Sequence, residues 1–284
     1  MSQAQIVTIP DANFKNALVN TLCVGTDGNG SVDSDADTND DGGIQVSEAE
    51  AVVFRLRVKN NNISSLEGIQ SFTNLEELQC AANQLTSLNV SQNTNLEVLT
   101  CSINELSSLD LTQNTNLERL DCRSNQLSNL DVTQNPNLEL FECDNNQLNR
   151  LNVKNGNNHN MLTMLAHDNP NLTCIQVDDV NYANSQTCGQ SSWCKDNWVQ
   201  YSEDCSLGSE DFNKLSFALY PNPTQDVLNI DSQEPVDSVR IYSINGSLIK
   251  ETNPSISVSE LSKGLYFAQI NVGGNTITKK FIKP

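Results

Sequence analysis

The sequence of 284 residues is poor in basic residues and in aromatic residues, and it has no long apolar run. No stretch of 18 or more apolar residues occurs, so we expect no transmembrane segment. With 16 Lys and Arg against 35 Asp and Glu, the net charge of −19 argues against nucleic-acid binding, which needs clustered cations. Aromatic residues make up only 5% of the chain, which gives no basis for a carbohydrate platform of stacked rings.

The residues of common enzyme classes are also missing. The chain has 2 histidines and no G-x-S-x-G, H-E-x-x-H or phosphate-binding glycine motif. We therefore predict that the protein is not an enzyme and has no catalytic residue. A glycan hydrolase that uses two carboxylates is the alternative, because such pairs assemble in space and leave no local signature.

The sequence does contain a repeat with a period of 21 residues. Four units begin at Asn74, Asn95, Asn116 and Asn137, and each fits L-x-x-L-x-C-x-x-N-x-L. This pattern resembles the leucine-rich repeat, with Cys in the place of the third Leu. Degenerate copies on both sides extend it to about six repeats over residues 52–173. The resemblance implies a solenoid in which one short strand per unit joins a parallel sheet on the concave side.

Three columns of side chains are expected inside this solenoid, because alternate strand residues point inward. The first is Leu78, Leu99, Leu120 and Phe141. The second consists of buried free thiols, since Val58 and Ala166 take the same place in the outer repeats; it is Cys80, Cys101, Cys122 and Cys143. The third satisfies backbone groups at the bend after each strand, and it is Asn61, Asn83, Asn104, Asn125, Asn146 and Asn169.

The outward strand positions form the predicted concave face, where a ligand would bind. Five of the nine basic residues before residue 210 fall on it. Such a strip would bind carboxylates, sulfates or phosphates of a protein or an anionic glycan. The alternative is that these charges only keep the exposed strands soluble. The candidate ligand-binding residues are Arg55, Arg57, Lys59, Arg119 and Arg123.

Residues 1–51 are predicted to cap the N-terminal end of the solenoid, with a helix that begins after Asp11. An acidic loop follows, and its last part matches the twelve-residue EF-hand pattern, with Gly42 at the sharp turn and Ile44 at the apolar eighth position. Oxygen donors of this kind suit Ca²⁺, and the alternative is a disordered acidic loop. The predicted calcium ligands are Asp37, Asn39, Asp41, the carbonyl of Gly43, and Glu48.

Residues 174–205 are rich in cysteine and are predicted to close the C-terminal end of the solenoid. Their four cysteines allow three pairings. We favour Cys174 with Cys205 and Cys188 with Cys194, and disulfides here imply an oxidising compartment. The role of Cys23 stays open.

Residues 206–214 are interpreted as a linker, and residues 215–284 alternate apolar residues with turns, which predicts an antiparallel β-sandwich. Four of its segments resemble the type A sorting domain of type IX secretion cargo in the Bacteroidota. They are Leu219–Thr224 followed by Asp226, Ile241–Gly246, Leu261–Phe267, and Lys279–Lys283. The resemblance implies an immunoglobulin-like fold and recognition by the type IX secretion machinery, while cleavage of the domain stays open.

The expected fold class is therefore α+β but mostly β: a leucine-rich-repeat solenoid followed by an immunoglobulin-like sandwich. We expect a secreted or cell-surface interaction or adhesion protein whose repeats bind a macromolecule, and the alternative is a structural component of the surface layer. No intact signal peptide is present. The opening Met-Ser-Gln-Ala-Gln is interpreted as the remnant of one, and an ordinary start is the alternative.

Overall fold

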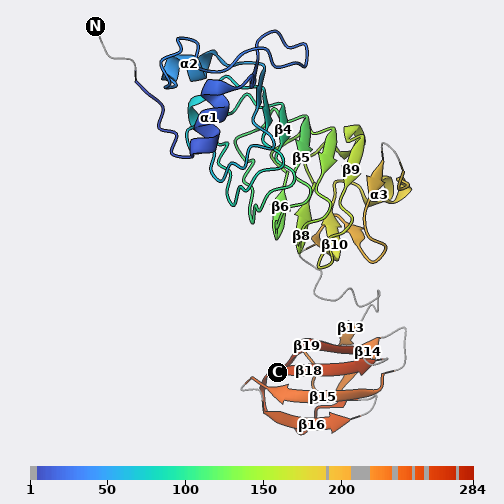
Figure 1. The fold of residues 1–284 in the computed structure, drawn as a ribbon. Helices are drawn as coiled ribbons and strands as arrows, with labels where there is room; N and C mark the ends of the chain where they lie inside the picture. Colours follow the sequence, from blue (N-terminus) through green and yellow to red (C-terminus); the bar gives the residue numbers. More distant parts are fainter. Residues whose placement is uncertain are drawn as a thin grey trace. The chain divides into compact units, whose positions relative to one another are not determined.

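The computed structural model divides into two compact units, Met1–Ser206 and Leu207–Pro284, each of which is described by itself (Figure 1). The described residues are 5–189, 192–205, 218–231, 236–244, 247–252, 256–272 and 275–284. The predicted linker, residues 206–214, lies outside them.

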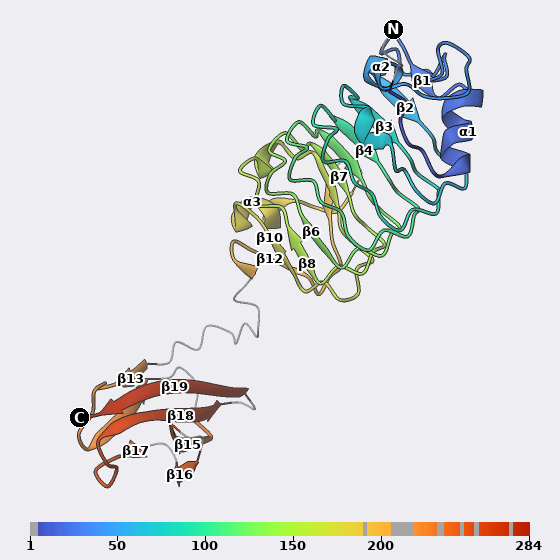
Figure 2. The same ribbon diagram turned by 90° about the vertical axis from the view of Figure 1, so that its left-hand side faces the viewer.

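A sheet of eight short strands runs along the first unit (Figures 1 and 2), in the order β1-β2-β3-β4-β5-β7-β9-β11. β1 and β2 are antiparallel, and all later neighbours are parallel. The sheet thus continues one coil past the six predicted repeats, into the cysteine-rich segment. The strands are β1 (Val24–Gly25), β2 (Arg55–Arg57), β3 (Glu77–Gln79), β4 (Val98–Thr100), β5 (Arg119–Asp121), β7 (Leu140–Glu142), β9 (Thr163–Leu165) and β11 (Trp193–Cys194).

A second, parallel sheet of four strands, which the repeat pattern did not predict, forms where the later coils return. The central residues Leu130, Leu151 and Ile175 of three of its strands are buried. The coils from β5 onward are therefore held together along two lines of backbone hydrogen bonds. In sheet order the strands are β12 (Gln200–Ser202), β10 (Cys174–Gln176), β8 (Arg150–Asn152) and β6 (Asn129–Asp131).

The core of the solenoid consists of stacked columns, because every coil places the same position at the same height. The strand register places the residues of the predicted Leu column side by side in neighbouring strands. The column also includes Leu56 at one end and Met164 at the other. All six side chains are 0% exposed, and each contributes roughly 1.5–3 kcal/mol of burial free energy. The four repeat cysteines are also fully buried and free, as predicted.

The asparagine column lies where the chain turns away from the sheet. Nδ2 of Asn104 donates to the carbonyls of Cys80 and Cys101 at 3.1 and 3.0 Å, and its Oδ1 accepts from the Leu85 amide at 3.0 Å. The same pattern joins each later coil to the one before it. Asn61 differs: its Nδ2 donates to Lys59 two residues earlier, because an antiparallel strand precedes this first coil.

A second buried asparagine column, on Asn93, Asn114 and Asn135, was not predicted. Each Nδ2 donates to two carbonyls of earlier coils, as Asn114 does to Val90 and Asn93 at 3.0 and 2.9 Å. The sequence contained a signal for this column, because Gln-Asn recurs at this place in three of the four full repeats and Lys-Asn in the fourth. The polar residues around it are typical of an exposed turn and gave no sign of burial.

Short helices close both ends of the solenoid. α1 (Ala12–Asn20) begins after Asp11, whose Oδ1 accepts from the amides of Asn13 and Phe14 at 2.9 Å, as expected for an N-cap. α2 (Val46–Ala51) and the 3₁₀ helix η1 (Ile69–Ser71) follow. Near the other end lie η2 (Asn158–Asn160) and α3 (Val180–Ser185). Disulfides join Cys174 to Cys205 and Cys188 to Cys194, the pairing favoured from the sequence.

The second unit is an antiparallel β-sandwich, as expected from its alternating pattern. Its sheets have the orders β13-β14-β17 and β16-β15-β18-β19, and their buried residues form one apolar core. The Leu219–Thr224 segment lies along β19, where the Thr224 amide donates to the Ile282 carbonyl at 3.0 Å. The strands are β13 (Ala218–Tyr220), β14 (Val227–Asp231), β15 (Ser238–Ser243), β16 (Leu248–Thr252), β17 (Ile256–Ser257), β18 (Gly264–Val272) and β19 (Asn275–Lys283).

Candidate functional site: the outward face of the long sheet

The outward residues of β2, β3, β4, β5, β7 and β9 form a continuous surface, named here the sheet face. The register aligns Arg55, Glu77, Val98, Arg119, Leu140 and Thr163 in one row. It aligns Arg57, Gln79, Thr100, Asp121, Glu142 and Leu165 in the next. The sequence therefore placed these side chains on the correct face, but their partners emerge only from the structure.

Two of the predicted ligand-binding arginines are already engaged within the protein. Arg55 forms an ion pair with Glu77 of the next coil, and both side chains are only 15% exposed. Nε of Arg57 donates to Oε1 of Gln79 at 2.9 Å, and its Nη2 donates to the Gly30 carbonyl at 3.2 Å. An anionic ligand would have to compete with these contacts. Lys59 is exposed and has no ion pair among the described residues.

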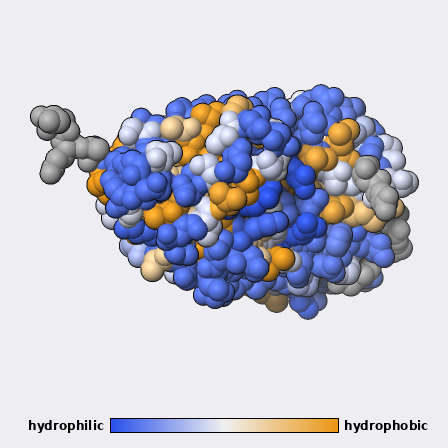
Figure 3. Space-filling model, turned by 45° about the horizontal axis from the view of Figure 1, so that its top comes forward, coloured by the Kyte–Doolittle hydropathy of each residue, from blue (hydrophilic) through white to orange (hydrophobic). Residues whose placement is uncertain are grey.

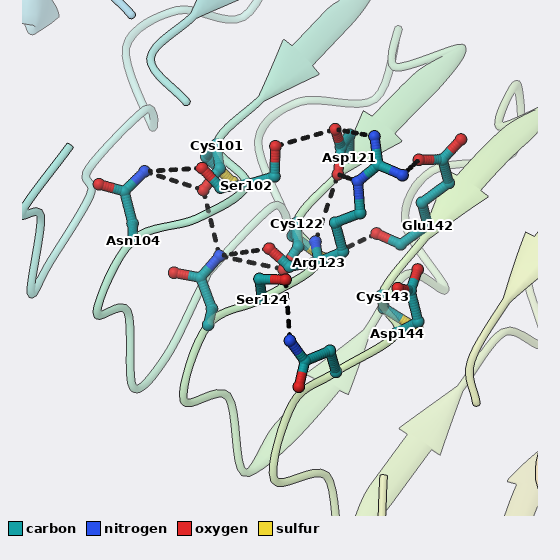
Figure 4. A network of polar contacts seen from close by, with 12 residues as sticks. Cys101, Ser102, Asn104, Asp121, Cys122, Arg123, Ser124, Glu142, Cys143 and Asp144 are labelled. Carbon is teal, nitrogen blue, oxygen red and sulfur yellow. Dashed lines mark hydrogen bonds and ion pairs between the residues drawn. The ribbon is translucent and has the colours of Figure 1, made fainter. Parts of the chain in front are cut away.

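A network of charged side chains occupies the middle of the sheet face (Figure 4). Arg123 lies between Asp121 and Glu142, with Nε–Oδ1 and Nη1–Oε2 distances of 3.2 and 3.1 Å. The second contact is an ion pair whose alignment does not make it a hydrogen bond. The Ser102 hydroxyl donates to Oδ2 of Asp121 at 2.9 Å. Asp121 is thereby held rigidly, and it is only 2% exposed.

Asp144 extends this network but is not neutralised by it. Its Oδ1 is buried and has no hydrogen-bond partner among the described residues. Burial raises the pKa of the Asp144 carboxyl, and the charges of His167 and Arg123 oppose that shift. His167 instead contacts Oδ2 of Asp168 through Nδ1 at 2.8 Å. The centre of the sheet face thus holds three carboxylates against one guanidinium. Two of their buried oxygens, Oε2 of Glu142 and Oδ1 of Asp144, accept no hydrogen bond from the described residues.

Arg119 completes the predicted set of basic residues. It is exposed on β5, and the described part of the chain contains no ion pair to it. Of the five basic candidates, three are therefore held by neighbouring coils, while Lys59 and Arg119 remain open to solvent. The predicted basic strip is not a continuous cationic surface.

The predicted calcium loop has a left-handed backbone conformation at two positions. Asp40 and Gly42, at its fourth and sixth positions, have φ of 57° and 81°. Glycine suits the sixth position, because it lacks the Cβ that makes a positive φ costly for other residues. Oδ2 of Asp37 accepts from the Gly42 amide at 2.8 Å, and the Val7 amide donates to the Ile44 carbonyl at 2.8 Å. The loop is thus closed on itself and tied to the N-terminal segment.

The oxygen atoms of the predicted ligands suit a hard cation, but in this structure they do not converge on one point. Oε2 of Glu48 accepts from the Gln45 amide at 2.9 Å, and its Oε1 accepts from the Thr38 hydroxyl at 2.8 Å. Oδ1 of Asp41 accepts from the Gly43 amide. Within the described residues, no three His, Cys, Asp or Glu side chains cluster as metal ligands. Calcium binding would therefore require these carboxylates to turn from the backbone toward a common point.

The repeat cysteines form a buried column of thiols and no reactive site. Burial raises the pKa of the Cys80 thiol to about 12, and burial likewise raises the pKa of the other three well above the ordinary value. Because the thiolate is the reactive form, these groups are inert in the folded protein. Cys23 is also free and buried, and burial raises its pKa to about 12.

We therefore expect no labelling of the native protein by a thiol reagent at pH 8, and labelling of five thiols after unfolding in denaturant without reductant. Rapid labelling of the native protein would contradict the burial of the column.

The raised thiol pKa also predicts that the stability of the folded protein depends on pH. Because the pKa is higher in the folded state, the contribution of each buried thiol to the free energy of unfolding is complete below the ordinary pKa of 9.0. It is lost as the pH rises toward about 12. Chemical unfolding measured from pH 8 to 10 checks this.

The first unit is a solenoid whose architecture fits the leucine-rich repeat, and the second unit is a β-sandwich. Residues 218–284 match the family described as the Secretion system C-terminal sorting domain. The chain therefore carries a sorting domain, which implies the type IX secretion machinery as a partner and a secreted or outer-membrane-surface location. In the described residues no helix is long and apolar enough to span a bilayer.

Solved structures give further matches. A structure described as the functional domain of InlJ from Listeria monocytogenes, including a cysteine ladder, is 29% identical with a TM-score of 0.47. The match covers 62% of this chain but only 38% of that one. Two structures of CBM51-2 and INT domains from Clostridium perfringens ZmpB, one with GlcNAc, are 11% identical. Their TM-scores are 0.27 and 0.23, with coverage of 100% of this chain and 37% of theirs. No curated protein matches.

Proposed function

We propose that this protein is a secreted or surface-displayed binding protein, and not an enzyme, whose sheet face holds a macromolecular ligand. The observation that carries the proposal is the network centred on Arg123, with the unpaired Oδ1 of Asp144 beside it. A buried acceptor without a partner carries a free-energy cost that a ligand donor can remove. The sorting domain supports a location where such a ligand would be met.

The chemistry of the network indicates which ligand group it would accept. Asp121 and Glu142 are bridged by Arg123, whereas Asp144 has no such cation. A hydrogen-bond donor or a positively charged group of the ligand would therefore pair with Asp144, while Arg123 would donate to a second, oxygen-bearing group. This differs from the carboxylate, sulfate or phosphate groups expected from the sequence, and Lys59 and Arg119 remain available for anionic parts of a large ligand.

The test is binding of the full chain to an array of glycans and extracellular matrix proteins. We expect the Arg123→Gln/Asp144→Asn variant to lose affinity by about tenfold or more, because it removes two charge-assisted contacts. The Arg55→Ser/Arg57→Ser/Lys59→Ser variant should bind nearly as well as the parent. A loss of affinity in the Arg55→Ser/Arg57→Ser/Lys59→Ser variant alone would place the ligand on the basic strip. No binding across the array would contradict the proposal.

We also propose that the loop formed by residues 37–48 binds Ca²⁺ and orders the N-terminal cap. Asp37, Asn39, Asp41, the Gly43 carbonyl and Glu48 would hold the ion through oxygen atoms. The support is the positive φ at positions four and six of the loop, together with the burial of Asp37 and Glu48, at 2% and 7% exposure. Its role would be structural, because the loop leads into α2 and is tied to the N-terminal segment by the bond from the Val7 amide to the Ile44 carbonyl.

A further inference from the structure

A pocket of about 300 Å³ opens beside the sheet, where the regular repeat is interrupted. In the regular coils, the residue just before each strand is a glutamate, and the amides of Glu97, Glu118 and Glu139 each donate to the carbonyl of the previous glutamate at 2.8 Å. These glutamates therefore stack in a ladder that begins at Glu76. At the next coil the ladder ends, because Leu162 takes the same position before β9.

The coil that ends the ladder also carries an insertion. Leu140 pairs with Arg119, 21 residues earlier, whereas Thr163 pairs with Leu140, 23 residues earlier. The two additional residues lie in the segment that contains η2 (Asn158–Asn160), a 3₁₀ turn that the coils before β4, β5 and β7, all within the described residues, do not have. The pocket thus exists because one repeat is longer than its neighbours.

η2 is fixed against the C-terminal cap and provides a firm wall. The ring of its central residue, His159, contacts the ring of Tyr182 of α3, with centroids 4.1 Å apart and planes tilted by 33°. The Tyr182 hydroxyl donates to the His159 carbonyl at 3.3 Å. Asn158 is buried, and its Nδ2 donates to the Val153 carbonyl at 2.6 Å. A wall held by three independent contacts gives the pocket a defined shape.

The pocket lining joins negative charge to an apolar surface. Glu118, Glu139 and His159 line it together with Leu162, whose side chain is 58% exposed. Neither glutamate takes part in an ion pair in the described part of the chain. The backbones of the two glutamates are hydrogen-bonded neighbours, about 4.8 Å apart, so their two negative charges repel one another, and a concave lining concentrates their field. The face of the molecule seen in Figure 3 is mostly hydrophilic.

We propose that this pocket binds an organic cation, an ammonium or guanidinium group carried on an aliphatic chain. The charged head lies between Glu118 and Glu139, the aliphatic part covers Leu162, and the side-chain amides of Asn137 and Asn160 line the rim. Lysine and arginine side chains of a protein and free polyamines share this chemistry. The site is separate from the network around Arg123 and does not depend on the function proposed for it.

The ladder supplies its own control. Glu76 and Glu97 occupy the same repeat position and have the same spacing, but they do not line the pocket. Glu118→Gln/Glu139→Gln and Glu76→Gln/Glu97→Gln therefore remove equal charge from equivalent backbone positions. Only Glu118→Gln/Glu139→Gln removes negative charge from the pocket. Comparing the two variants therefore distinguishes binding at this site from the general attraction of cations to an acidic protein.

The experiment is titration of the full chain, with calcium constant, by calorimetry or NMR. The probes are acetyl-Gly-Lys-Gly-amide, its arginine and norleucine analogues, and putrescine. We expect saturable binding of the lysine or arginine peptide or putrescine, none of the norleucine peptide, and a loss of about tenfold or more in Glu118→Gln/Glu139→Gln. Glu76→Gln/Glu97→Gln should bind within about twofold of the parent. Tighter binding of putrescine would indicate a free polyamine as the source of the cation, and tighter binding of a peptide would indicate a protein side chain.

Three results would overturn the site: equal losses in the two double variants, equal binding of the norleucine peptide, or no saturable binding at millimolar probe. Both double variants replace carboxylates by amides of nearly the same shape, so the fold should persist. Their thermal unfolding, compared with that of the parent, checks this.

Discussion

Replacing Asn125 by alanine is expected to lower the free energy of unfolding of the repeat unit by about 3 kcal/mol. Nδ2 of Asn125 donates to the carbonyls of Cys101 and Cys122 at 3.1 and 3.0 Å, and Oδ1 accepts from the Leu106 amide at 3.0 Å. Alanine would leave the buried Leu106 amide without a partner, at a cost of about 1–3 kcal/mol. It would also remove one of the two asparagine donors to each carbonyl, because Cys101 keeps only Asn104 and Cys122 keeps only Asn146.

The control for this variant is Asn116→Ala. Asn116 is exposed, and its Nδ2 makes one bond, of 3.3 Å, to the Thr94 carbonyl of the previous coil. Its replacement should change stability by about 0.5 kcal/mol or less. Both tryptophans of the chain, Trp193 and Trp198, lie in the repeat unit, so their fluorescence during urea unfolding reports that unit alone. Similar losses in the two variants would show that the asparagine column does not hold the coils together.

Chelating calcium is expected to lower the melting temperature of the repeat unit, and this is the second large effect. A ligand that binds only the folded state stabilises it by about 2.7 kcal/mol at a concentration one hundred times its Kd. The N-terminal cap is packed on the first coil, where the Ser64 amide and hydroxyl donate to Oδ2 of Asp11 at 2.8 and 2.7 Å. Loss of order in the cap would therefore expose the end of the core.

The decisive variant is Glu48→Gln. Glutamine retains the capping box that Glu48 forms with Gln45 at the start of α2, but it removes the charge needed for the twelfth ligand. We expect the melting temperature of this variant to be the same in calcium and in EGTA. Asp40→Asn is the control, because Asp40 is an exposed non-ligand of the same loop with φ of 57°, which asparagine tolerates. A parent protein that melts equally in calcium and EGTA would rule out the calcium proposal.

The predictions from sequence were strongest where one position repeats in every coil. A residue such as Leu120 or Cys122 is placed by the period alone, because stacked coils bring equivalent positions together whatever their neighbours are. The Asp11 N-cap followed from a local pattern. The C-terminal domain could be recognised because its motifs are short, ordered and specific.

The contacts of the sheet face could not be predicted in the same way. Arg55 and Arg123 were assigned to the correct face, yet each is engaged by a carboxylate of a neighbouring coil. Whether an arginine is free depends on side-chain geometry between residues about 20 apart in the chain. The pattern showed the charges but not their pairing, so a basic strip was predicted where the structure has a mixed network.

The sequence by itself determined the strand register, the buried columns, the two ends of the solenoid and the sorting domain, because each follows from a period or a local motif. The tertiary structure alone decided which charges are neutralised and which remain open, since that depends on distances between coils. It also revealed the second sheet and the pocket at Glu118 and Glu139. That pocket results from two extra residues in one repeat, whose effect appears only when the coils are stacked and η2 meets the cap.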